Sequence, residues 1–193
     1  MVIGLTGGTG SGKTTALRVL RQLGAQCFDA DAVYHGMLQS DGTMLQAIEA
    51  AFPGVVQHGV LDRRALGARV FGDAAALQRL SELTQPRVAA KIRAELAGDL
   101  CVIDAIGLFE SGLSRLCDHT VAVLAPRAQR IARLIARDGL TEAQAARRID
   151  AQPPDAVFAA RCDTVLQNDA DEASFEARCR HYFSQLCGKP LPK

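Results

Sequence analysis

The sequence predicts a three-layer α/β/α fold with a five-stranded parallel sheet, a helical substrate-binding insertion and a lid. Two observations support this fold class. Short apolar segments with the pattern of buried strands alternate with helical segments, which is typical of a parallel sheet covered on both faces. A glycine-rich loop at residues 7–14 separates the first apolar segment from the first helical one.

The first elements are short and follow the alternating pattern. Strands are expected at residues 2–5 and 26–28, and helices at residues 13–23 and 31–39. Gly24 is a stop signal for the first of these helices, because glycine readily takes the left-handed conformation that ends helices.

A long helical stretch then interrupts the alternation. Residues 43–98 contain no convincing strand, and only a short turn is expected around residues 55–60. Breaks are expected at Pro53-Gly54, Gly59, Gly72-Asp73 and Pro86. Because the stretch departs from the pattern of the sheet, residues 32–98 are predicted to form a helical subdomain for an acceptor substrate.

The second half of the chain returns to strands and helices. Strands are expected at residues 100–104, 120–124 and 164–166, and helices at 126–137, 141–152 and 172–186. Thr141 and Gln144 match a capping box. The predicted divisions are a nucleotide-binding core at 1–31, 99–138 and 163–187, a lid at 139–162 and a flexible tail at 188–193.

The glycine-rich loop matches the phosphate-binding pattern G-x-x-x-x-G-K-[ST]. Its glycines let backbone N–H groups approach phosphate oxygens, Lys13 adds positive charge, and Thr14 offers a hydroxyl to Mg²⁺. The helix that follows adds the positive end of its dipole. The loop therefore predicts a P-loop NTP hydrolase-type fold that binds a nucleoside triphosphate. The expected nucleotide ligands here are Gly8, Thr9, Gly10, Ser11, Gly12, Lys13, Thr14 and Thr15.

Three acidic residues end predicted strands: Asp29, Asp31 and Asp104. In an open parallel sheet, ligands bind beyond the carboxyl ends of the strands. If the chain is extended here, Asp29 and Asp31 point to the same side, so one could orient Mg²⁺ while the other accepts a proton from a hydroxyl. Asp104 suits a role beside Mg²⁺. Helix N-capping is the alternative for Asp29 and Asp31, and a strand-end turn is the alternative for Asp104.

Three arginines share one face of the helix expected at residues 126–137. Arg130, Arg133 and Arg137 are three and four residues apart, and like charges at this spacing repel unless an anion lies among them. A triphosphate is the candidate anion, and solvated surface arginines are the alternative.

The lid helix and one histidine complete the candidate site. Arg148 lies on the capped helix, between breaks at Gly139 and Pro153-Pro154 that would let it move and exclude water. His35 follows Asp31 by one helical turn and could face the same cleft, with a surface role as the alternative.

Composition limits the classes of partner and compartment. The 193 residues carry 22 Lys and Arg against 21 Asp and Glu, so charge gives no argument for nucleic acid or a membrane surface. Six cysteines without any C-x-x-C pair argue against a zinc or redox site and favour reduced thiols in a cytoplasmic protein. A monomer is expected, with an oligomer left open.

Taken together, the motifs resemble the dephospho-coenzyme A kinase family over nearly the whole chain. The matching stretches are G-L-T-G-G-x-G-S-G-K-[ST] at 4–14, D-A-D at 29–31, L-D-R-x-x-L-x-x-x-V-F at 61–71, L-F-E at 108–110, R-L-x-x-R-D at 133–138, R-I-x-A-Q at 148–152 and the closing Asn168. The chain departs from the family pattern at Arg130, where the family has Gln, at Ile106-Gly107 and at Gln85.

The resemblance implies ATP-dependent phosphorylation of the 3′-hydroxyl of dephospho-coenzyme A, the last step of coenzyme A synthesis. It implies that Asp31 is the base and that Lys13 and Arg133 are catalytic, while Arg137, Arg148 and Asn168 bind ATP. The acceptor contacts it implies are Thr6, Asp29, Asp31, His35, Arg63, Pro86, Leu108 and Glu110, and the metal ligands are Thr14 and Asp104.

Two other functions are weighed against this one. A nucleoside or nucleotide kinase of the same architecture would differ in its acceptor. A P-loop regulatory switch that reads guanine typically carries N-K-x-D, which the sequence lacks because its only asparagine is Asn168, followed by Asp169-Ala170.

Overall fold

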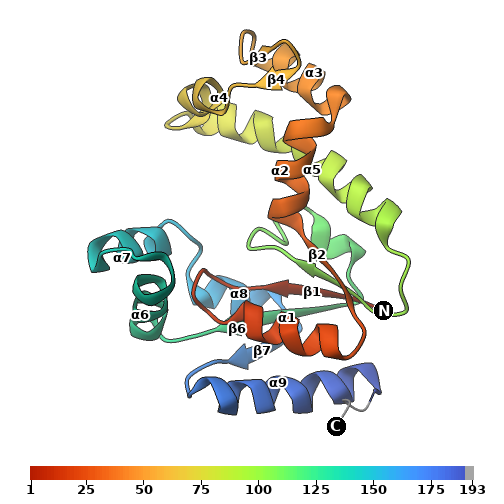
Figure 1. Ribbon diagram of the computed structural model, residues 1–193, viewed down its shortest axis with the longest axis vertical. Coiled ribbons are helices and arrows are strands. Elements are labelled where there is room, and N and C mark those ends of the chain that lie inside the picture. Colours follow the sequence, from red (N-terminus) through yellow and green to blue (C-terminus); the bar gives the residue numbers. More distant parts are fainter. Residues whose placement is uncertain (190–193) are drawn as a thin grey trace.

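A computed structural model describes residues 1–189, and a five-stranded parallel sheet forms its centre (Figure 1). The strands are β1 (Val2–Thr6), β2 (Gln26–Asp29), β5 (Cys101–Asp104), β6 (His119–Leu124) and β7 (Thr164–Gln167). They lie in the order β2-β5-β1-β6-β7, and every neighbouring pair is parallel. The predicted sheet is confirmed. Its central strands are almost wholly buried, which explains why they read as continuous apolar runs.

Helices cover both faces of the sheet. On one face, α1 (Lys13–Gln22) and α9 (Glu172–Cys187) pack with Ile3 and Leu5 of β1. On the other face, the 3-10 helix η1 (Leu113–Leu116) and the helix α8 (Asp155–Arg161) bury Leu113 and Phe158. The predicted three-layer arrangement is therefore confirmed, although neither η1 nor α8 is expected from the sequence.

The helical insertion stands away from the sheet (Figure 1). Its elements are α2 (Ala30–Ser40), α3 (Gly42–Ala51), α4 (Arg63–Val70), α5 (Ala74–Glu95) and an antiparallel hairpin of β3 (Val56–Gln57) and β4 (Val60–Leu61). Met44, Ile48 and Ile92 are fully buried among these helices. The sequence predicts only a turn at the hairpin, because each strand is two residues long and shows no alternation.

The helix α5 continues through Pro86, so the break predicted there is wrong. A proline inside a helix removes one backbone hydrogen bond and crowds the preceding turn. The carbonyl that loses its donor is that of Glu82, four residues before the proline. The two side-chain hydrogen bonds nearby, from the Thr84 hydroxyl to the Leu80 carbonyl and from the Arg87 guanidinium to the Leu83 carbonyl, do not replace that bond. Packing of Val88 and Ile92 in the core holds the helix beyond the proline.

Two helices at the left of Figure 1 form a hairpin: α6 (Arg127–Asp138) and α7 (Glu142–Asp150). They pack through Leu134, Ala145 and Ile149, and the predicted capping box of Thr141 and Gln144 is present. The predicted lid range also contains α8. This helix packs against the sheet and not against α7. Residues 139–162 therefore do not all pack in one place.

The tail prediction at 188–193 is only partly open to comparison. Gly188 ends α9 with a φ of 60°, and the Lys189 N–H donates to the Ser184 carbonyl, so these two residues form an ordered helix cap. Residues 190–193 lie outside the described residues. Among residues 1–189, no helix combines the length and apolar character that crossing a membrane requires.

Candidate active site

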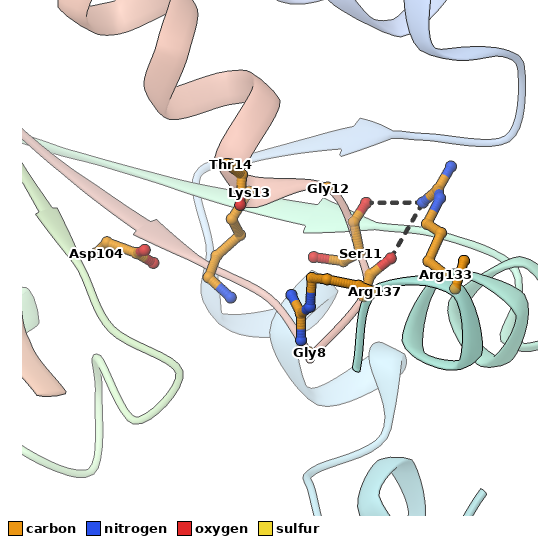
Figure 2. A pocket seen from close by; sticks show the side chains of 10 residues that line it. Gly8, Ser11, Gly12, Lys13, Thr14, Asp104, Arg133 and Arg137 are labelled. Atoms are coloured by element: carbon orange, nitrogen blue, oxygen red, sulfur yellow. Dashed lines mark hydrogen bonds between the residues drawn. The ribbon is translucent and has the colours of Figure 1, made fainter. Parts of the chain in front are cut away.

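A cavity of about 470 Å³ lies over the phosphate loop (Figure 2). Its lining joins the loop to β5 and α6, and comprises Gly8, Gly10, Ser11, Gly12, Lys13, Thr14, Asp104, Arg133, Ala136 and Arg137. Most of the predicted nucleotide ligands therefore come together in one place. Thr9 and Thr15 belong to the same loop and helix but do not line this cavity.

Side chains from elsewhere in the chain hold the carbonyl groups of the loop. The Asn168 amide donates to the Ser11 carbonyl over 2.8 Å, and the Arg133 guanidinium donates to the Gly10 carbonyl over 3.1 Å. In a trans peptide the N–H points away from the carbonyl of the same unit. Holding the Ser11 carbonyl therefore turns the Gly12 N–H the opposite way, as a backbone anion site needs.

Asn168 is not placed as a nucleotide ligand, contrary to the sequence expectation. The residue is 3% exposed, and both ends of its amide are used, because Nδ2 donates to the Ser11 carbonyl and Oδ1 accepts from Arg133 over 3.1 Å. Gly12 has a φ of 107°, and a Cβ on it would lie 2.1 Å from the Asn168 nitrogen. Asn168 therefore supports the loop from behind, and only glycine fits at position 12.

Lys13 reaches across the cavity floor. Its Nζ donates to the Gly7 carbonyl over 2.8 Å, and in Figure 2 the Asp104 carboxylate points toward the side of the cavity where the Lys13 side chain lies. Burial lowers the pKa of Lys13 below its usual 10.5, while the charges of Asp104 and Asp31 act to raise it. A lysine held in this way is a charge that a triphosphate can neutralise.

Asp104 is the acidic residue of this cavity. Burial raises its pKa from 3.8 to about 6, although nearby Lys13 acts to lower it. Among the described residues its Oδ1 has no hydrogen-bond partner, although the atom is buried. Such an orphaned carboxylate oxygen, in a cavity that Thr14 also lines, fits a hard cation such as Mg²⁺, which prefers oxygen ligands and keeps several waters.

Asp29 and Asp31 have different roles in the structure. The chain is not extended over residues 29–31, because α2 begins at Ala30, so the condition under which Asp29 and Asp31 would point to the same side is not met. Asp29 is the N-cap of α2 and accepts from the Ala32 N–H over 3.0 Å. The capping alternative therefore applies to Asp29, whereas Asp31 lies in the first helical turn and is exposed.

Asp31 lines a second cavity of about 240 Å³ between the helical insertion and the loop after β5. Gln85 and Gly107, two of the positions where the chain departs from the family pattern, line this cavity with it. Polar residues that the sequence reasoning missed are also present: Tyr34, Ser81, Thr84 and Ser111. Ser81, Thr84, Gln85 and Val88 have the i, i+3, i+4, i+7 spacing of one helix face, which was the available signal.

Two of the predicted acceptor contacts are buried. The Thr6 side chain is inaccessible, and its hydroxyl donates to the Ile106 carbonyl over 3.0 Å. Leu108 is also fully buried, in the core beneath η1. Neither side chain can reach a substrate in this arrangement, so both instead hold the loop that follows β5.

The other predicted acceptor residues lie outside both cavities. His35 is exposed, with its ring next to Tyr34 of the cavity lining. Arg63 is the first residue of α4, and Pro86 follows the cavity residue Gln85. Glu110 pairs with Arg161. Of the predicted acceptor residues, Asp31 is therefore the one that lines the second cavity.

The arginines of α6 divide into different environments. Arg133 and Arg137 line the phosphate cavity, and Figure 2 shows Arg133 donating to the loop. Arg130 is buried and contacts the loop from outside the cavity. Arg148 of α7 pairs with Asp138 over 3.0 Å and does not line the cavity.

Comparisons with known proteins identify the family of the chain. The model of the dephospho-CoA kinase (CoaE) family matches residues 1–174. The dephospho-CoA kinase of Paramagnetospirillum magneticum is 43% identical over 80% of this chain and 76% of its own length. That of Novosphingobium aromaticivorans is 40% identical over 92% of this chain and 90% of its own length. The crystal structure of TT1252 from Thermus thermophilus superimposes with a TM-score of 0.78 at 31% identity, covering 96% of this chain and 97% of that one.

A parallel sheet, a phosphate loop with its lysine and the match to a kinase family place the chain in the class of P-loop kinases. Within this class, the chain belongs to the dephospho-CoA kinase family. The resemblance seen in its motifs is thereby confirmed, and the alternatives of a nucleoside or nucleotide kinase and a regulatory switch are not favoured.

Proposed function

We propose that this chain transfers the γ-phosphoryl group of ATP to the 3′-hydroxyl of dephospho-coenzyme A, giving ADP and coenzyme A, with Asp31 as the general base. The observation that carries the assignment of Asp31 is its place between the two cavities. Its side chain lines the second cavity, which we name the acceptor cavity. Its charge acts on both Lys13 and Asp104 in the first cavity, over the phosphate loop, which we name the phosphate cavity. A base for a hydroxyl nucleophile must lie at this junction.

The nucleotide phosphates bind over the loop in this proposal. The backbone N–H groups of the loop and the Lys13 ammonium neutralise their charge, and Arg133 and Arg137 approach from α6. Phosphoryl transfer needs mainly positioning and charge neutralisation, and this lining supplies both. Arg148 contributes only if it exchanges its Asp138 partner for a phosphate.

Thr14 and Asp104 are the residues that would hold Mg²⁺. When bound there, Mg²⁺ would offset the negative charge that develops during phosphoryl transfer. Among the described residues no cluster of three or more His, Cys, Asp or Glu side chains is suited to a metal, so the remaining ligands would be phosphate oxygens and water.

The setting of the enzyme follows from its chemistry and composition. We propose that it acts in the cytoplasm as a monomer, with the helical insertion taking the acceptor and the α7 region acting as the lid. The six cysteines are unpaired in the structure, as reduced thiols are in a reducing compartment.

The test of the base is Asp31→Asn, which removes a proton acceptor at nearly constant volume. Turnover should fall by about 10²–10⁴, the usual contribution of a general base, while the Kd for ATP stays unchanged. Asp41→Asn is the matched control, because Asp41 caps α3 in the same insertion and asparagine also caps helices. Near-wild-type turnover in Asp31→Asn would assign the base elsewhere.

A further inference from the structure

Side chains outside the phosphate cavity hold both backbone groups of Thr9. The Thr9 N–H donates to the Gln152 side-chain oxygen over 2.8 Å, and the Thr9 carbonyl accepts from Arg130 Nε over 2.9 Å. Neither of these side chains lines the cavity. Residues more than 100 positions away in the chain thus fix the conformation of the loop at its tip.

Arg130 is a buried charge whose partners are all in place. Its side chain is 4% exposed, and its remaining nitrogens donate to Asp155 over 2.9 Å and to the Gln152 oxygen over 3.2 Å. Burying a guanidinium is costly unless it is paired and hydrogen-bonded. Asp155 supplies the opposite charge, while Gln152 accepts from both the loop and Arg130.

We propose that Arg130 and Gln152 are positioning residues for ATP, forming with Asp155 a clamp that sets the phosphate loop. Holding the Thr9 carbonyl turns the N–H of the same peptide unit, which belongs to Gly10, to the opposite side. Gly10 lines the phosphate cavity, so the clamp aims this N–H at the phosphates without touching them. The inference rests on the proposed function only in that ATP is the nucleotide bound.

The clamp lies so close to the loop that only glycine fits at position 8. A Cβ on Gly8 would lie 2.1 Å from the Arg130 guanidinium and 3.0 Å from the Gln152 oxygen. The clamp also joins three elements, because Arg130 lies on α6, Gln152 follows α7 and Asp155 begins α8. The residue that holds the Thr9 N–H therefore lies two residues beyond the end of α7, the helix that carries Arg148.

The experiment measures the Kd of ATP and of ADP by calorimetry for Gln152→Leu and Arg130→Met, without acceptor. Both Kd values should rise by about tenfold in Gln152→Leu, the effect of losing one well-placed hydrogen bond at about 1.4 kcal/mol per factor of ten. The Kd of dephospho-coenzyme A should stay within about twofold, because the clamp does not reach the acceptor cavity. Gln152→Glu keeps the acceptor oxygen and should recover most of the nucleotide affinity.

The matched control is Arg127→Met. Arg127 also joins α6 to α7, through Asp150 at 2.7 and 3.0 Å, but it does not touch the loop. Arg130→Met could fail to fold because Asp155 is left without its partner. In that case the nucleotide affinity of Gln152→Leu still tests the clamp, since this variant leaves no carboxylate unpaired. Nucleotide affinities equal to wild type, or losses no larger than in Arg127→Met, would overturn the proposal. ATP affinity is read without acceptor, so failure of the clamp and failure of the proposed acceptor are separate results.

Discussion

Replacing Asn168 with alanine tests whether Asn168 supports the phosphate loop or binds the nucleotide directly. The Asn168 amide donates to the Ser11 carbonyl over 2.8 Å and accepts from Arg133 over 3.1 Å, and it is almost inaccessible to solvent. Alanine removes both hydrogen bonds and leaves the two partners inside the protein. The structure therefore predicts a loss of stability even when no nucleotide is present.

The size of the loss follows from the partners that remain. Each buried group left without a partner costs about 1–3 kcal/mol. Arg133 keeps the Gly10 carbonyl and the Gln129 oxygen, so its cost is at the lower end of this range. We expect the free energy of unfolding to fall by about 2–4 kcal/mol, and the Kd for ATP to rise by about tenfold because the Gly12 N–H is no longer held.

Urea unfolding followed by circular dichroism, without nucleotide, measures the effect. Gln129→Ala is the control, because Gln129 is another acceptor of Arg133 but is more exposed, and a loss below about 0.5 kcal/mol is expected. An unchanged free energy of unfolding in Asn168→Ala, together with a lost preference for ATP over GTP, would refute the supporting role and restore direct contact with the nucleotide.

Three further predictions concern the cavities. Lys13→Met should abolish most turnover in a coupled assay for ADP release, and a rate within about tenfold of wild type would contradict its role at the phosphates. Burial raises the pKa of Asp104 from 3.8 to about 6, so the folded protein without metal binds an extra proton between these pH values and loses stability as the pH rises through them, by about 2 kcal/mol between pH 4.5 and 7. Asp104→Asn should remove this loss in urea titrations at pH 4.5 and 7 with EDTA, and the same pH dependence in both proteins would argue against it. Gln85→Ala should raise the KM for dephospho-coenzyme A by about fivefold while leaving the Kd for ATP unchanged, and the reverse pattern would place Gln85 outside the acceptor site.

The sequence predicts the sheet and the helix ends well because their signals are local. The apolar strands, the glycine-rich loop and the capping box of Thr141 and Gln144 each lie within a few residues. The helix through Pro86 is missed because packing in the core of the insertion holds it, and that core is built from segments distant in the sequence. The strand order is not predicted, because it depends on contacts between distant segments.

The site is predicted in its chemistry but less well in its contacts. Lys13, Asp104 and Arg133 do line one cavity, since the loop and the strand ends determine where they lie. Arg130 and Asn168 instead hold the loop from outside, through partners more than 100 residues away in the chain. Spacing along a helix shows which residues share a face, and it does not show which of them the neighbouring backbone will bind.

The acceptor is the most direct test of the account. The purified chain should be supplied with ATP and Mg²⁺ and with dephospho-coenzyme A, a nucleoside or a nucleoside monophosphate in turn, and the products identified by mass spectrometry. We predict one coenzyme A for each ADP formed with dephospho-coenzyme A, and little product with the other acceptors. Rapid phosphorylation of a nucleoside or a nucleoside monophosphate, with none of dephospho-coenzyme A, would contradict the proposed function.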